Sequence, residues 1–164
     1  MQKSVSSPSN ALQWIAFTLC MLGLMQEYCK IALWLLLECG EWGAHCSNQT
    51  ERLEAAILCL RAELRNFCAQ LKESVTPPHD LTMKMVGKPA DPKLKHLSGA
   101  ETWAMLQYLN HAMAKHAAKV GPQAATIGEA GKMLDKTHRL SRETSGKVPV
   151  RIQQDVHLNF IIYI

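Results

Sequence analysis

The stretch Trp14-Ile-Ala-Phe-Thr-Leu-Cys-Met-Leu-Gly-Leu-Met-Gln-Glu-Tyr-Cys-Lys-Ile-Ala-Leu-Trp-Leu-Leu-Leu37 is apolar over almost its whole length. It predicts a helix from about Ala11 to Cys39 that is apolar nearly all round, so most of its sides must be covered. Its first unbroken apolar run stops before Gln26, whereas a membrane-spanning helix needs about twenty apolar residues. Three interpretations remain open: a core or oligomer helix, a membrane-associated element, or the core of a cleaved signal.

A second helix is predicted from a start signal around Asn48 and Glu51, which suit the first turn of a helix. Its apolar residues recur at alternating spacings of four and three, which is a heptad seam about three heptads long. The seam could pair two copies of the chain as a coiled coil, or could pack on the first helix as a hairpin. The residues predicted for oligomerisation are Leu53, Ile57, Leu60, Leu64, Phe67 and Leu71.

The segment Val75–His79 contains Pro77 and Pro78 and interrupts the helical pattern, because proline lacks an amide donor and restricts the residue before it. We therefore predict a division of the chain into lobes. The predicted parts are a flexible leader over 1–10, a helical lobe over 11–76, a linker over 77–98 with a candidate strand over 81–86, and a basic helical lobe over 99–164.

The last seventeen residues, Val148 to Ile164, alternate almost without error between apolar even positions and polar odd positions, and Gln154 is the only even position that breaks the pattern. This is the period of a strand with one apolar face, and a length well beyond the usual five or six residues favours two strands. The predicted fold class is therefore mainly α, with helical hairpins and a small C-terminal antiparallel β element. Because the apolar face needs a partner, we predict pairing between copies of the chain through Val156, Leu158, Phe160 and Ile162.

Positive charge is concentrated in the second half of the chain, where residues 77–164 hold twelve Lys and Arg against seven Asp and Glu. Such an asymmetry is typical of a polyanion partner. A helix predicted over about 123–144 places several cations near one face, where they could meet phosphates without reading bases; a solvated helix face is the alternative. The predicted nucleic-acid-binding residues are Lys132, Lys136, Arg139, Arg142, Lys147 and Arg151.

No pattern in the sequence predicts catalysis. His111 and His116 are five residues apart, which is wrong for a shared metal on one helix face, and HExxH is absent. Gly87-Lys88 is followed by Pro89 and lacks the Ser or Thr of a phosphate loop. We predict no enzyme activity, no catalytic residue, no metal and no cofactor, and we expect the six cysteines to be reduced thiols in a cytoplasm.

The C-terminal segment Ala130-Gly-Lys-Met-Leu-Asp-Lys-Thr-His-Arg-Leu140 through Gln154-Asp-Val-His-Leu-Asn-Phe160 resembles the end of the small terminase subunits of tailed bacteriophages. The resemblance implies a helical hairpin that drives ring formation and a C-terminal strand segment in an intersubunit barrel, next to a large ATP-driven subunit. The helix-turn-helix of that family is not recognisable before Asn48. No functional residue is transferred from the family.

These patterns together predict a non-catalytic protein that associates with itself and handles nucleic acid, such as a DNA-packaging component. Its expected partners are further copies of the chain, duplex DNA and a larger protein, in the cytoplasm, or in the host cytoplasm if the chain is viral. The alternative is a membrane-associated helical protein anchored through residues 11–37.

Overall fold

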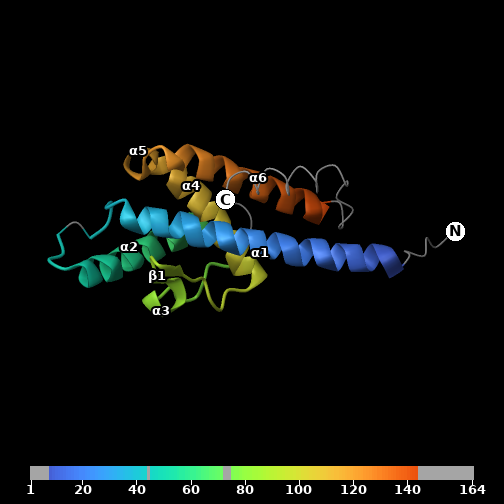
Figure 1. The fold of residues 1–164 in the computed structure, drawn as a ribbon, viewed down its shortest axis with the longest axis horizontal. Helices are drawn as coiled ribbons and strands as arrows, with labels where there is room; N and C mark the ends of the chain where they lie inside the picture. Colours follow the sequence, from blue (N-terminus) through green and yellow to red (C-terminus); the bar gives the residue numbers. More distant parts are fainter. Residues whose placement is uncertain (1–7, 44, 72–74, 144–164) are drawn as a thin grey trace.

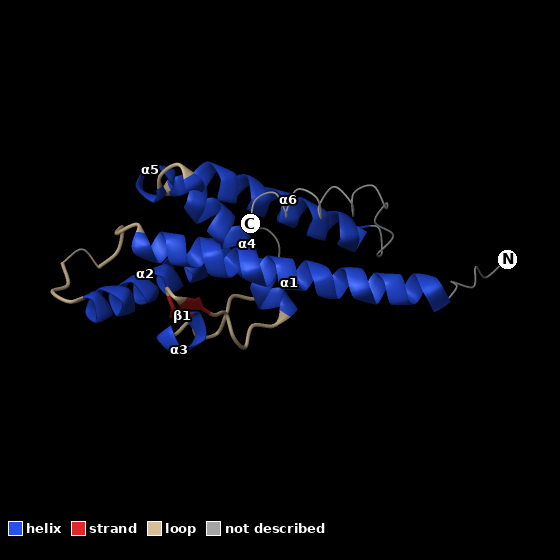
Figure 2. Cartoon of the chain, viewed as in Figure 1, coloured by secondary structure: helices blue, strands red, loops and turns tan. Residues whose placement is uncertain are grey.

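The computed structural model describes residues 8–43, 45–71 and 75–143, with side chains from Thr18 onward. The described chain is mostly helical (Figures 1 and 2), which confirms the predicted class. Its elements in chain order are α1 Pro8–Glu38, α2 Gln49–Gln70, α3 Met83–Val86, β1 Gly87–Lys88, β2 Asp91–Pro92, α4 Gly99–Lys115, α5 Ala117–Val120 and α6 Gln123–Glu143.

The body of the molecule is formed by α1, α4 and α6, which pack against one another, while α2 packs mainly on α4. In the view of Figure 1, α6 lies on one side of α1, and α3 with the short sheet lies on the other. One cluster of buried apolar residues joins these elements. Its members come from both predicted lobes, for example Leu33 and Leu60 from the first and Leu106 and Leu134 from the second.

The helix α1 is a core helix over its second half. Tyr28, Cys29 and Leu33 are buried, and the Trp34 indole N–H donates a 3.1 Å hydrogen bond to the Val86 carbonyl oxygen. The stretch Thr18–Glu38 is also long and apolar enough to cross a membrane, a test that the core helix of a soluble protein passes equally well. Toward its N-terminus, α1 extends beyond the other described helices (Figure 1).

The heptad seam of α2 faces the chain's own core. Ile57, Leu60 and Leu64 are buried in the common cluster, and Leu53 and Phe67 pack against it. The prediction that this seam pairs two copies of the chain is therefore wrong for its central residues, because α1 and α4 of the same chain already cover them. The alternative, packing within the chain, is what is observed, although α4 contributes more of the contact than α1.

The strand predicted over 81–86 is not formed, because the segment makes a helical turn instead. The Thr82 carbonyl accepts hydrogen bonds from the amides of Met85 (2.9 Å) and Val86 (3.1 Å). Both Leu81 and Val86 are buried by this turn. The apolar residues of the segment 81–86 that predicted a strand are therefore accommodated by a single helical turn. The antiparallel sheet comes directly afterwards, pairing Gly87 with Pro92 and Lys88 with Asp91. The C-terminal strands predicted over 148–164 lie outside the described residues.

The N-terminus of α4 is fixed by a capping box. The Ser98 hydroxyl accepts from the Glu101 amide, and the Glu101 carboxylate accepts from the Ser98 amide at 2.8 Å. From Thr102 to Leu109 every side chain of α4 is buried. The helix α4 is therefore surrounded by α1, α2 and α6, and it contacts all three.

Candidate functional site

Two of the predicted phosphate-binding arginines on α6 lie against an indole ring. The guanidinium carbons of Arg139 and Arg142 are 5.6 and 4.9 Å from the centre of the Trp103 ring, within the range of cation–π attraction. Asp135 accepts a hydrogen bond from the Trp103 indole N–H (3.1 Å) and another from Arg139 (3.0 Å). These contacts hold both arginines close to the body, so neither is a freely extended surface cation.

The two predicted lysines of α6 are more accessible. Lys132 is exposed and forms an ion pair with Glu129 at 2.7 Å, an exposed pair of the kind that contributes little to stability. Lys136 is exposed and has no ion pair among the described residues. Both lysines line a groove between α4 and α6, together with Arg139. The other two predicted residues, Lys147 and Arg151, lie outside the described part of the chain.

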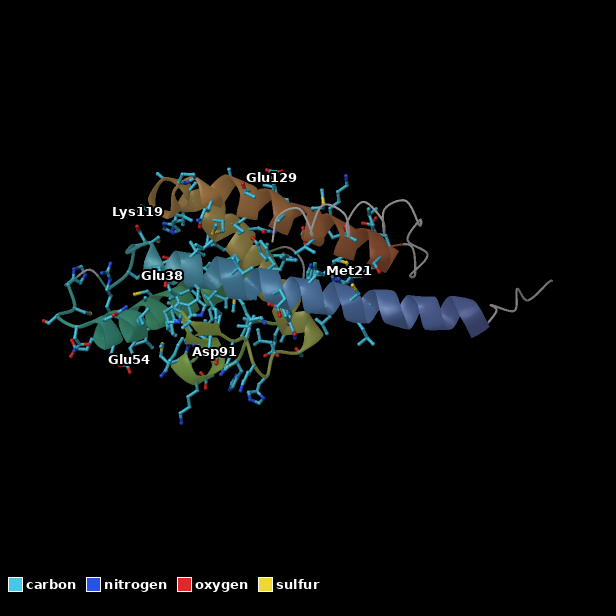
Figure 3. All side chains as sticks on the ribbon, in the orientation of Figure 1. Met21, Glu38, Glu54, Asp91, Lys119 and Glu129 are labelled. Atoms are coloured by element: carbon cyan, nitrogen blue, oxygen red, sulfur yellow. The ribbon has the colours of Figure 1, made fainter. Side chains whose placement is uncertain are left out.

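A second basic surface lies on the segment 83–95, which we call the lysine hairpin. Between Lys84 and Lys95 the segment carries four lysines and one aspartate. Lys84, Lys88 and Lys95 are exposed and have no ion pair among the described residues, while Lys93 pairs with Asp91. In Figure 3, Asp91 and Glu129 lie on opposite sides of α1, so the hairpin and the α6 lysines belong to different faces.

The lysine hairpin is anchored to the core by its backbone. The Lys93 amide donates to the Val86 carbonyl at 2.8 Å, and the same carbonyl accepts from the Trp34 indole. Leu94 is buried beneath it. Gly87 has φ +80°, and a Cβ there would lie 2.5 Å from the Asp91 carbonyl oxygen, so the turn requires glycine. The lysines therefore project from a fixed support.

Sequence reasoning missed the lysine hairpin because it treated 77–98 as a linker. The signal was present in the close spacing of Lys84, Lys88, Lys93 and Lys95. Gly87, Pro89 and Pro92 lie between these lysines, and such residues are typical of an irregular connection, so the segment was not predicted to be packed. The burial of Val86 and Leu94 and the hydrogen bond from the Trp34 indole show that the segment is packed.

A third cluster surrounds Glu63 on α2. Its carboxylate accepts hydrogen bonds from the Trp42 indole (3.1 Å), the Tyr108 hydroxyl (3.3 Å) and the Lys115 ammonium (3.3 Å). Burial raises the pKa of Tyr108, and the Glu63 charge acts in the same direction, so the phenol stays protonated and donates. Within the described residues no group of three or more His, Cys, Asp or Glu side chains could hold a metal ion. The cluster ties α2 to α4 and is structural.

Comparison of the chain with known protein families, with curated proteins and with solved structures gave no match. Two surfaces of the described chain carry exposed lysines, the face of α6 with Lys132 and Lys136 and the lysine hairpin. Both present ammonium groups to solvent without converging on a reactive centre.

Proposed function

We propose that this protein is a non-catalytic nucleic-acid-binding protein whose lysine hairpin contacts the phosphate backbone. The observation that carries the proposal is that Lys84, Lys88 and Lys95 are exposed, without ion pairs among the described residues, and fixed on a packed hairpin. Because the backbone of the hairpin is already packed, contact with a phosphate has to order only the lysine side chains. Lys132 and Lys136 supply a second, weaker contact surface on α6.

The chemistry of these side chains supports contact with phosphates rather than with bases. Lysine is a compact point charge that neutralises a phosphate and releases its counterions. The segment 83–95 contains no aromatic residue, so it has no platform on which unpaired bases could stack. Binding through it should therefore depend strongly on salt and little on base sequence.

The wider role we propose is a self-associating subunit that handles duplex DNA, such as a packaging component that acts beside a larger protein in the cytoplasm. Self-association would be carried by the alternating tail, because the central α2 seam is already buried. The likeness of the C-terminal residues to small terminase subunits supports this role, and the fold supports it only through its exposed lysines.

The test is binding of a labelled duplex of about twenty base pairs, measured by fluorescence anisotropy over a series of salt concentrations. We expect the triple variant Lys84→Gln, Lys88→Gln, Lys95→Gln to bind more weakly at every sequence tested. The slope of log affinity against log salt should fall by about 0.9 for each phosphate that is no longer neutralised, or roughly 2.7 for three. The double variant Lys132→Gln, Lys136→Gln should reduce the slope by a smaller amount.

The matched control is Lys119→Gln, because Lys119 pairs with Glu41 and should not be available to a phosphate. It should leave both affinity and slope unchanged. The proposal fails if the full-length protein does not bind duplex DNA at low salt, or if the triple variant binds with the same salt slope as the unchanged chain.

A second candidate function is association with a membrane surface through the beginning of α1. The observation in its favour is Leu19, which is 65% exposed on a helix that extends beyond the other described helices. Anchoring by the whole of 11–37 would pull buried residues such as Leu33 out of the core. Sedimentation with vesicles of neutral and of anionic lipid separates this candidate from the first, since binding to neutral vesicles cannot come from the lysines.

A further inference from the structure

A cavity of about 400 Å³ lies where α1, the segment at Val75 and the facing ends of α4 and α6 meet. We propose that this cavity binds a single-chain amphiphile with an anionic headgroup. Pockets that hold small ligands typically have volumes of about 300–1,000 Å³ and are mostly apolar with a few polar groups. The proposal does not rest on the DNA contact proposed above, which is made by the lysine hairpin and the α6 lysines. Arg142 is shared only with the sequence-based prediction of phosphate-binding residues, and Ala100 is part of neither.

The inner part of the cavity is apolar. Met21, Leu22 and Met25 face it from α1, and Trp103 faces it from α4. Met25 and Trp103 are almost fully buried, so the cavity reaches the edge of the core. Methionine side chains are unbranched and adapt to irregular shapes, which suits contact with a flexible hydrocarbon chain.

The ionisable groups that line the cavity come from one side only, from α6, while Thr18 and Thr76 add hydroxyls from α1 and the segment at Val75. His138, Ser141 and Arg142 line the cavity from the last turns of α6. No Asp or Glu is among the residues described as lining the cavity, and no ion pair joins Arg142 to a carboxylate in the described part of the chain. The nearest candidate, Asp135, is engaged by Trp103 and Arg139. The positive charge of Arg142 is therefore left for a ligand.

The end of the cavity that would hold the anionic headgroup is formed by Trp103 and the α6 side chains beside it. The Arg142 guanidinium lies 4.9 Å from the Trp103 ring centre, which orients it beside the apolar wall. Burial lowers the pKa of His138, and the charge of Arg142 acts in the same direction, so the imidazole is neutral at pH 7. An anionic headgroup would thus meet one fixed cation, one neutral imidazole and the Ser141 hydroxyl, with its chain directed toward Met25.

These features select the ligand class. An apolar wall alone would take any hydrophobic molecule, and a cation alone would take any anion. Their combination within one cavity favours a molecule with a charged end and an apolar end, such as a carboxylate or a phosphate monoester on a single alkyl chain. A nucleic-acid strand does not match, because most of the cavity wall offers no partner to its charged backbone.

The probes are dodecanoate, dodecyltrimethylammonium and acetate, each titrated into the full-length protein below its micellar concentration and followed by calorimetry. We expect saturable binding of about one dodecanoate per chain. The cationic amphiphile has the same chain and the opposite charge, and it should bind at least tenfold more weakly. Acetate has the headgroup alone and should show no binding, since the chain supplies the burial of apolar surface.

Two variants test the two halves of the site. Arg142→Gln should weaken dodecanoate binding by roughly tenfold or more, as expected for one charge-assisted hydrogen bond. Ala100→Phe adds a ring to an exposed position that lines the cavity and should block the chain. Arg139→Gln is the matched control. Arg139 also contacts Trp103, but it lines the groove that holds Lys132 and Lys136 and is not among the residues that line the cavity.

The proposal is overturned if dodecanoate does not bind, if the cationic amphiphile binds equally well, or if both Arg142→Gln and Ala100→Phe bind dodecanoate like the unchanged chain. Circular dichroism confirms that each variant is folded before it is titrated. The DNA-binding assay on the same variants keeps the two proposals apart. Ala100→Phe should leave DNA binding unchanged, so either proposal can fail without the other.

Discussion

Gly131 lies on α6 over the 2.7 Å hydrogen bond that the Tyr28 hydroxyl donates to Asn110. A methyl group at Gly131 would be 1.9 Å from the Asn110 oxygen and 2.3 Å from the Tyr28 oxygen. Alanine ordinarily favours a helix over glycine by about 1 kcal/mol, but here α6 would have to move away from α1 and α4. We expect Gly131→Ala to lower the free energy of unfolding by about 1–3 kcal/mol in urea titrations.

The same helix supplies the control for that prediction. A Cβ at Gly128 would meet no heavy atom within 4 Å. Gly128→Ala should therefore raise the free energy of unfolding by about 0.4–1 kcal/mol, because only the helix propensity changes. Equal effects of the two substitutions would contradict the close approach of α6 to Tyr28 and Asn110.

His116 is buried at the end of α4, and its ring meets the Trp42 ring edge to face at 5.3 Å. Burial lowers its pKa below the usual 6.5 and outweighs the opposing charge of Glu41; Lys115 and Lys119 also lower it. The unfolded chain therefore binds more protons than the folded chain as the pH falls through 6.5. We expect stability to be fully present above pH 6.5 and to decrease below it, seen as a lower urea midpoint at pH 5.5 than at pH 7.5.

The variant His116→Phe isolates this contribution, since it keeps a ring beside Trp42 and removes the titrating group. Its urea midpoint should depend less on pH than that of the unchanged chain. His138 contributes in the same direction, because burial also lowers its pKa, so part of the dependence should remain. An identical pH dependence in His116→Phe would show that His116 does not carry the effect.

Glu63 illustrates what the sequence could not reveal about single residues. The heptad pattern places it off the seam, where a charged side chain is expected to be solvated. Its partners Trp42, Tyr108 and Lys115 come from distant parts of the chain. No local pattern encodes that meeting, because it depends on how α4 crosses α2.

At the scale of elements, α2 shows that the spacing of apolar residues predicts a helix and its buried face but not what that face packs against. The spacing of Leu53 through Leu71 predicted the helix and its apolar face, and both are observed. It could not decide whether that face meets another copy or the same chain, because both arrangements bury the same residues. The decision depends on α4, whose side chains from Thr102 to Leu109 are all buried and need α2 as part of their cover.

Leu60 and Leu58 of α2 give a paired test of this arrangement. Leu60 is fully buried, while Leu58 is 61% exposed. Leu60→Ala should lower the free energy of unfolding by about 2–5 kcal/mol, and Leu58→Ala should change it by about 0.5 kcal/mol or less. Light scattering should give the same molar mass for Leu60→Ala, while it is folded, as for the unchanged chain. Dissociation of an oligomer by Leu60→Ala would restore the coiled-coil interpretation.

At the scale of the whole molecule, the fold class followed from the sequence, whereas the sharing of one core did not. The prolines near 77 indicate a break in the helix, and a break is easily taken for a boundary between lobes. In the structure the chain returns after that break to pack α4 between α1 and α6. Which helices meet is decided by long-range contacts such as Tyr28 with Asn110, which leave no periodic trace.

Self-association is a prediction about the residues beyond the described helices. If the alternating tail pairs copies of the chain, the full-length protein should elute as an oligomer, and a chain ending at Glu143 should elute as a monomer of unchanged helix content. Size-exclusion chromatography with light scattering measures both. A full-length monomer would contradict the prediction, as would an oligomer that survives the truncation.

The hydrogen bond from the Trp34 indole to the Val86 carbonyl allows local opening of the lysine hairpin to be measured by hydrogen exchange. It joins residues 52 positions apart and is buried. The indole proton exchanges with deuterated solvent when this hydrogen bond opens, as it does when the segment around Val86 lifts from α1. Its exchange lifetime, read from one resonance in a nuclear magnetic resonance spectrum, would therefore time the opening of the lysine hairpin without any label or mutation.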